Sequence, residues 1–268
     1  MYAPHKNFDT PALTQKIWRY LDFTKLVAML ESNCLFFPSI STLEDKFEGA
    51  YTNNVFPVIP NLVPVPANEI PTKLQDAITL AQEMDKAHRH NARNFRPLMY
   101  VNCWHMNNHE SAAMWKTYLK SNEGVAIAST IQSLTKCFKN PEAVYVGKVH
   151  YLDYNADVIG HDNFLRPVVC KRKSFEYENE VRAVVWDGDR YKSLLDGKML
   201  DTATGNWKPE VTFEPGRDIA VDVDILVEEI YVAPTSPQWF HKLIEATLKT
   251  YGLERTVKQS SLAEDPVW

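Results

Sequence analysis

Three glutamates crowd into five residues within the stretch 171–186, which reads KRKSFEYENEVRAVVW. Glu176, Glu178 and Glu180 follow a basic triplet and precede an apolar, β-branched run. That run has the composition of a β-strand, whose side chains alternate between two faces. If the extended backbone begins early, the three carboxylates share one face with Arg182. Neighbouring carboxylates repel one another, so basic groups or a ligand must offset their charge.

Two interpretations of this acidic stretch are open. In the first, the glutamates form ion pairs on a solvated strand edge and contribute little else. In the second, they line a catalytic or ligand-binding site at the start of the strand, and the basic residues Lys171–Lys173 lie beside it. Glu180 lies immediately before the rigid strand, so we expect it to be the best positioned acid. Glu178 is intermediate, and Glu176 is expected to be a surface acid.

Composition places the chain among ordinary globular proteins. Its 268 residues are 45% hydrophobic and 24% charged, with a net charge of −5. Such a balance gives no general attraction to nucleic acid or to anionic membranes. The four cysteines are far apart, which predicts free thiols in a reducing compartment. The N-terminus is polar and no run is long enough to span a membrane, so we expect a cytoplasmic protein without membrane association.

Short strands and helices alternate irregularly along the chain. Strands are expected at 17–20, 34–37, 98–104, 125–129, 143–151, 181–186, 219–223, 229–232 and 255–259, and helices at 23–32, 71–96, 111–119, 130–138 and 238–251. Residues 1–15 read as a loose N-terminal arm, 51–70 as an irregular proline-rich segment, and 187–216 as a loop or hairpin insertion. The sequence therefore predicts a single α+β domain over residues 1–268, with mixed short-strand sheets and flanking helices.

The histidines do not predict a metal site. His105 and His109 are four residues apart, a spacing that suits zinc on a helix. Asn107 and Asn108 between them favour a turn instead, and the H-E-x-x-H pattern is missing. We therefore expect no bound metal here.

Several short segments resemble, in order, the domain of unknown function 2971 family of bacterial proteins. The segments are Trp18-Arg19-Tyr20, Leu35–Pro38, Leu43–Gly49, Cys103-Trp104, Met114-Trp115 with Tyr118, Glu123–Ala126, Tyr177–Arg182 and Glu229–Val232. Together they span most of the chain. Where relatives often carry Asn-Asp-Pro, this chain has Glu44-Asp45-Lys46, so no role is carried over to that loop.

The order of elements also resembles the opening of the ADP-ribosyltransferase-like folds. These folds place an arginine in a first short strand, an aromatic residue in mid-chain and a glutamate at the mouth of a late strand. The matching residues are Arg19, Tyr118 and Glu180, with Glu178 as the other candidate acid. The resemblance implies an NAD-using enzyme, with a toxin or anti-phage effector as the expected role.

The chemistry of NAD cleavage suits these residue types. Breaking the glycosidic bond builds positive charge on the ribose, which a fixed carboxylate stabilises. Arg19 is the candidate to bind the pyrophosphate, with Arg182 as a second basic candidate. Trp115 and Tyr118 are the candidate rings to stack on nicotinamide, although both also suit a hydrophobic core. The partners would be a small nucleotide and a protein or nucleic-acid acceptor.

The same residues are also compatible with two other functions. A nucleic-acid-binding protein or nuclease would use Lys171–Lys173 with Arg89, Arg93 and Arg96, and would hold Mg²⁺ on the clustered glutamates. A non-catalytic sensing or interaction protein would need none of these residues. The transferase interpretation requires Arg19 and the late glutamates to converge on one cleft.

Overall fold

A computed structural model describes residues 1–53, 70–119, 121–160 and 163–266, with only the backbone described at 70–75, 77, 78 and 81. Most of the irregular segment expected at 51–70 lies outside these residues. The strands are β1 (Lys16–Asp22), β2 (Cys34–Pro38), β3 (Met99–Met106), β4 (Gly124–Thr130), β5 (Tyr145–Lys148), β6 (His150–Leu152), β7 (Cys170–Arg172), β8 (Glu180–Trp186), β9 (Gly216–Ala220), β10 (Glu229–Val232) and β11 (Val257–Gln259). The helices are α1 (Phe23–Ser32), α2 (Ile70–Phe95), α3 (Ala112–Tyr118), α4 (Ile131–Lys136), α5 (Gly188–Asp196), α6 (Val223–Leu226) and α7 (Gln238–Thr250).

Seven strands of the described chain form one mixed sheet in the order β11-β10-β4-β1-β3-β8-β5. β10 and β11 run parallel, and the other neighbouring strands run antiparallel. Two small sheets accompany it, β2 with β9 and β6 with β7. The predicted α+β class, with mixed sheets and flanking helices, is confirmed.

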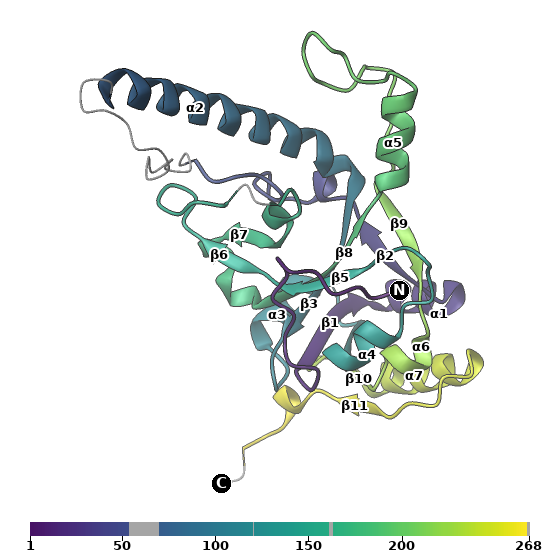
Figure 1. The fold of residues 1–268 in the computed structure, drawn as a ribbon. Helices are drawn as coiled ribbons and strands as arrows, with labels where there is room; N and C mark the ends of the chain where they lie inside the picture. Colours follow the sequence, from purple (N-terminus) through teal and green to yellow (C-terminus); the bar gives the residue numbers. More distant parts are fainter. Residues whose placement is uncertain (54–69, 120, 161–162, 267–268) are drawn as a thin grey trace.

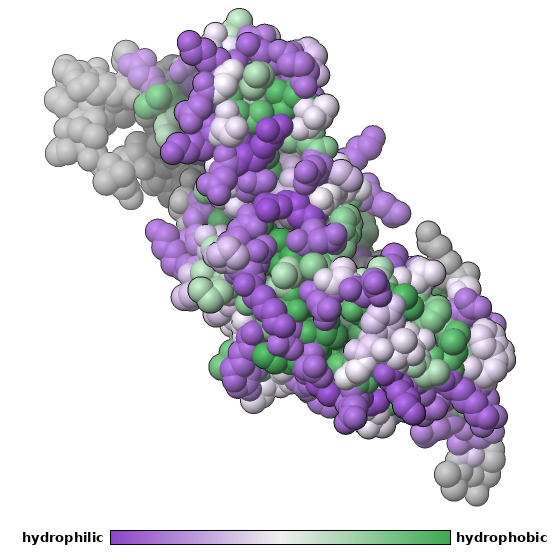
Figure 2. Space-filling view, turned by 90° about the vertical axis from the view of Figure 1, so that its right-hand side faces the viewer, coloured by the Kyte–Doolittle hydropathy of each residue, from purple (hydrophilic) through white to green (hydrophobic). Residues whose placement is uncertain are grey.

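Helices cover both faces of the large sheet. Along β1, Ile17 belongs to the main hydrophobic cluster, which also contains buried residues of α1, α4, α6 and α7. Trp18 and Tyr20 belong to another cluster, with Met114 and Trp115 of α3. Because strand side chains alternate, these two clusters lie on opposite faces. Figure 1 shows α2 and α5 extending away from the sheet, and Figure 2 shows hydrophobic residues gathered in the middle of one face.

β1 and β3 separate shortly after they meet. They pair only at Ile17↔Met106 and Trp18↔His105, whereas β1 pairs with β4 from Lys16 to Asp22. Beyond Trp18 the two strands no longer satisfy each other's backbone groups, which must find other partners. One partner is the side chain of Arg19, whose Nη1 donates to the Cys103 carbonyl at 2.9 Å.

The strand expected at 219–223 begins earlier, as β9 (Gly216–Ala220), and two other expected elements differ in kind from those observed. The strand expected at 143–151 is divided into two strands, β5 and β6. β5 pairs with β8, and the last contact with β8 is the hydrogen bond from the Val149 amide to the Glu180 carbonyl at 2.9 Å. The chain then leaves β8, and β6 pairs with β7. The segment 187–216, expected to be loop or hairpin, begins with helix α5. Asp187 caps this helix by accepting from the Arg190 amide at 2.9 Å.

The first fifteen residues contain no helix or extended strand, yet they pack on the sheet rather than forming a loose arm. The Ala3 amide donates to Val144 at 2.9 Å. Phe8 is buried and packs beside Gly147, where a Cβ would meet its ring at 2.9 Å. Across the described part of the chain, we find no helix with the length and hydropathy that a membrane crossing requires.

Candidate functional site

A cavity of about 610 Å³ lies where β1 and β3 separate. Its walls come from β1, β3, α1, β2 and the chain just before β8, and they are mainly apolar. The charged and polar lining includes Arg19, Lys25, Ser32, His105, Tyr118, Glu178, Glu180 and Asp218. This size, with a few polar groups in an apolar wall, is typical of a small-molecule site.

A cluster of three carboxylates and two cations lies at one end of the cavity. Arg182 is 1% exposed and forms ion pairs with Glu180 at 2.7 Å and Glu48 at 2.8 Å. The Nζ atom of Lys171 lies 2.5 Å from Glu178. It also lies 3.4 Å from both Glu180 and Glu48. With all five groups ionised, the cluster carries one excess negative charge, which a positive ligand group beside it would offset.

Glu178 and Glu180 reach this cluster by a route other than the expected strand alternation. Lys173–Glu178 is a 3₁₀ helix, and β8 begins only at Glu180. Between them, Asn179 adopts a left-handed backbone with φ of 38°. Glu176 is exposed, whereas the two later acids are buried. The expectation that all three share one strand face is therefore wrong: the turn at Asn179 brings two of them together.

Burial and neighbouring charge give the two glutamates different protonation behaviour. Burial by itself raises the pKa of Glu180, but Arg182 and Lys171 outweigh it and lower that pKa to about 2. Burial raises the pKa of Glu178, and Lys171 offsets only part of the rise. One acid thus stays ionised near neutral pH while the other takes up a proton more readily, a separation that suits acid–base chemistry.

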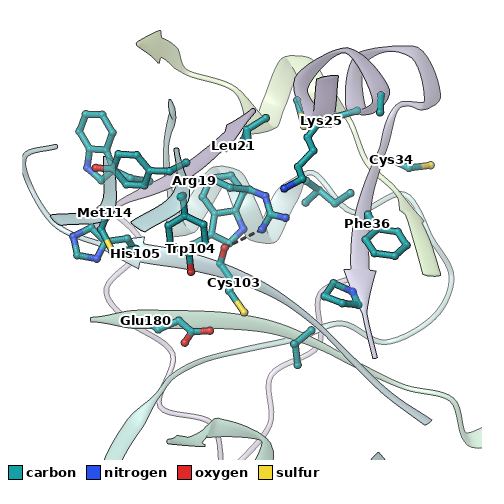
Figure 3. Close-up of a pocket in the computed structure, with 18 of the residues that line it drawn as sticks. Arg19, Leu21, Lys25, Cys34, Phe36, Cys103, Trp104, His105, Met114 and Glu180 are labelled. Carbon is teal, nitrogen blue, oxygen red and sulfur yellow. Dashed lines mark hydrogen bonds between the residues drawn. The ribbon is translucent and has the colours of Figure 1, made fainter. Parts of the chain in front are cut away.

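Arg19 has no ion-pair partner among the described residues. Its guanidinium donates to the Cys103 carbonyl and lies 5.9 Å from the centre of the Trp104 ring. Burial lowers its pKa, yet an arginine stays charged at neutral pH. Lys25 reaches the same region from α1 (Figure 3) and also pairs with Asp22 at 3.3 Å. The middle of the cavity therefore presents positive charge suited to an anionic group.

Cys103 connects this cation to the acids. Its carbonyl accepts from Arg19, and its side chain lies on the Glu180 side of the strand (Figure 3). Burial, with the neighbouring charge of Glu180, raises the pKa of the thiol well above its ordinary value, so the thiol stays protonated. Arg19 and Glu180 are thus separated by a single residue of β3 and line the same cavity (Figure 3).

The remaining candidates divide between the cavity wall and its support. Tyr118, at the end of α3, lines the cavity and is 42% exposed. Trp115 is 3% exposed, and its Nε1 donates to Glu110 at 2.8 Å rather than lining the cavity. Arg182 lies behind the acids, held by Glu48. Four of the six candidate residues lie on the wall: Arg19, Tyr118, Glu178 and Glu180.

Some residues of the site were not assigned to it by the sequence analysis. His105 lines the cavity, and its Nδ1 lies 2.5 Å from the Glu178 carbonyl. Burial lowers its pKa, which favours a neutral ring. Glu48 pairs with Arg182 across 134 positions of sequence. Its only sequence signal was the Leu43–Gly49 segment, and nothing local indicated that Glu48 and Lys171 would meet.

The basic triplet does not form a common surface for nucleic acid. Lys171 is buried among carboxylates, and Arg172 pairs with Asp45 at 2.8 Å, which leaves Lys173 exposed. The nuclease interpretation places Mg²⁺ among the clustered glutamates, but the Nζ of Lys171 lies between Glu178 and Glu180. Within the described ranges, no group of three or more His, Cys, Asp or Glu side chains is arranged to hold a metal ion.

No protein-family model and no curated protein matches this chain, so the resemblance to the domain of unknown function 2971 family stays a prediction. Solved structures of DarT from Thermus sp. 2.9 show a distant likeness. The complex with NAD⁺ has a TM-score of 0.36 and 10% identity, covering 93% of this chain and 96% of that one. The complex with carba-NAD⁺ has a TM-score of 0.33 and 10% identity, covering 93% and 95%. The complex with ADP-ribosylated ssDNA has a TM-score of 0.35 and 12% identity, covering 94% and 96%.

Proposed function

We propose that the cavity binds NAD and that the protein is an ADP-ribosyltransferase-like enzyme. The observation that best supports this is a charge pattern: Arg19, without an ion-pair partner among the described residues, lines the same cavity as an acid cluster with excess negative charge. NAD carries the complementary pattern, an anionic pyrophosphate and a cationic nicotinamide ring. A cavity of about 610 Å³ lies within the range of small-molecule sites.

In this proposal, each wall residue has one task. Arg19 binds the pyrophosphate, and Tyr118 packs beside nicotinamide. The bond between the ribose C1′ and the nicotinamide nitrogen breaks, and its electron pair leaves with nicotinamide. Glu180, ionised at neutral pH, stabilises the positive charge that develops on the ribose. An acceptor oxygen or nitrogen then bonds to C1′, and its proton passes to Glu178.

The acceptor is, as expected from the sequence, a nucleophile of a protein or a nucleic acid. Modification of either would make the protein a toxin or an anti-phage effector. Expression in bacteria tests this role: wild type should arrest growth, and the Glu180→Gln variant should not. Normal growth with abundant wild-type protein would contradict the toxin role.

The activity is tested with purified protein, NAD and bacterial lysates, by following nicotinamide release and transfer of labelled ADP-ribose. Wild type should show both. Arg19→Gln should weaken NAD binding by roughly 10- to 150-fold, because a charge-assisted hydrogen bond is lost. Lys16→Gln, an exposed change on the same strand, is the matched control and should behave as wild type. Wild-type protein that neither binds NAD nor releases nicotinamide would refute the proposal.

A further inference from the structure

The small sheet of β2 and β9 forms the wall at the end of the cavity away from the acid cluster. Phe36 and Asp218 are direct cross-strand partners in this sheet, and both line the cavity. Direct antiparallel partners have Cβ atoms about 5 Å apart, so the ring and the carboxylate face one space. Phe36 is 50% exposed although it lies in the middle of its strand.

Gly216 sets the position of the Phe36 ring. A Cβ at Gly216 would come within 2.2 Å of the ring, so any larger residue would displace it. The ring therefore lies against β9, and its exposed half is available for stacking on a flat ligand group. An exposed phenylalanine beside an exposed aspartate gains little from folding alone, which favours a binding role for the pair.

Charged and aromatic groups follow a fixed order along the cavity. Figure 3 shows Glu180 and His105 on one side of Arg19, and Phe36 on the other. Lys25 lies beside Arg19. The order is an acid cluster, a basic centre, and then a ring with an acid. NAD has its nicotinamide riboside, its pyrophosphate and its adenosine in the same order.

We propose that this end of the cavity is an adenosine subsite that selects NAD over NADP. The Phe36 ring stacks on adenine, and the Asp218 carboxylate accepts hydrogen bonds from the adenosine ribose. The same carboxylate repels the 2′-phosphate that distinguishes NADP. The neighbouring Arg217 does not offset this repulsion, because it pairs with Glu142 at 2.9 Å and Asp187 at 3.3 Å. This assignment rests on the proposed function, since it places the second half of the same ligand.

Calorimetric titration of the full chain with three probes tests the subsite: NAD, NADP and nicotinamide mononucleotide, which lacks the adenosine. Wild type should bind NAD at least about 10-fold more tightly than NADP. Phe36→Ala should weaken NAD binding by roughly 5- to 150-fold, the range for loss of an aromatic stack on a base. It should leave binding of nicotinamide mononucleotide unchanged. Asp218→Ala should bring NADP binding close to that of NAD.

Matched controls separate the subsite from general effects. Trp239→Ala removes an aromatic side chain that is 56% exposed and outside the cavity, and Asp224→Asn removes an exposed charge outside it. Neither should alter the three affinities. Phe36→Leu keeps an apolar side chain without the ring, and it should lose NAD affinity while it keeps the fold, as judged by circular dichroism.

The outcomes distinguish this inference from the function on which it rests. Wild-type protein that binds neither NAD nor nicotinamide mononucleotide overturns the proposed function and the subsite together. If wild type binds NAD and NADP equally, the selectivity is wrong. If Phe36→Leu weakens nicotinamide mononucleotide as much as NAD, the adenosine assignment is wrong. In both of these cases NAD binding itself stands.

Discussion

Glu178 and Glu180 share Lys171 as a neighbour, yet their surroundings give them opposite tendencies. The positive charges of Arg182 and Lys171 stabilise the anionic form of Glu180 and outweigh its burial, so its pKa falls to about 2. Glu178 has Lys171 but also the repulsion of its neighbour, and burial raises its pKa. Under the proposed function, this difference in pKa is the reason that Glu180 is given charge stabilisation and Glu178 proton acceptance.

The charge of Glu180 should be essential for turnover. Glu180→Gln preserves the shape of the side chain and removes its charge, so the turnover rate with NAD should fall about 100-fold or more. Nicotinamide release measures that rate. The exposed acid Glu176 provides the control, and Glu176→Gln should keep the wild-type rate. A variant Glu180→Gln that works normally, beside an inactive Glu178→Gln, would reverse the two roles.

At the scale of elements, the junction between the 3₁₀ helix and β8 determines where both acids lie. Asn179 has a φ of 38°, which places it in the left-handed region. Its carbonyl accepts from the Met106 amide at 2.8 Å, and its side chain donates to the Met106 carbonyl. These two hydrogen bonds hold the junction against the end of β3, the strand whose His105 lines the cavity.

A pair of variants at Asn179 tests this constraint. Asn179→Gly and Asn179→Ala both lose the side-chain bond to Met106, but only alanine opposes the left-handed backbone. We expect Asn179→Ala to unfold with a free energy about 1 kcal/mol lower than Asn179→Gly, measured by urea denaturation. Equal stability of the two variants would show that the backbone conformation costs nothing here.

At the scale of the whole molecule, the buried charge cluster ties stability to pH. Glu180 has a pKa of about 2 in the folded protein, below its ordinary value of 4.5. The unfolded chain therefore binds this proton more tightly. The stabilisation from Glu180 is complete above pH 4.5 and is lost as pH falls toward 2. Hydrogen bonds from Ser260, Trp115 and Ser261 outweigh burial and lower the pKa of Glu110, so Glu110 contributes with the same sign.

This linkage gives a measurable difference between wild type and Glu180→Gln. The variant leaves Arg182 and Lys171 with one fewer anion, so at pH 7 it should be less stable by about 3 kcal/mol. That difference should shrink steadily between pH 4.5 and 2, because wild type loses the same charge. Urea denaturation at a series of pH values measures it. A difference that stays constant down to pH 2 would contradict the lowered pKa of Glu180.

Elements with local signals in the sequence were predicted correctly. Helix α1 occupies the predicted residues 23–32, because its apolar stripe lies within that short range, and Asn33 ends it in a left-handed backbone conformation. Helix α7 covers Gln238–Thr250 of the predicted 238–251, and Gly252 beyond it has a positive φ of 72° that suits a glycine at a helix end. Arg19 and the late glutamates were also singled out, because a charged group inside or beside an apolar strand is visible without a structure.

Contacts between residues that are distant in sequence depend on how the elements pack. Lys171 and Arg182 join Glu48 because β7, β8 and the loop after β2 pack together, and no local pattern encodes that packing. The same packing turns the chain at Asn179 and sets two acids on one cavity. The pairing of β2 with β9 likewise places Phe36 opposite Asp218. Periodicity reports which face of an element is apolar, but it carries no information about the partner that will cover that face.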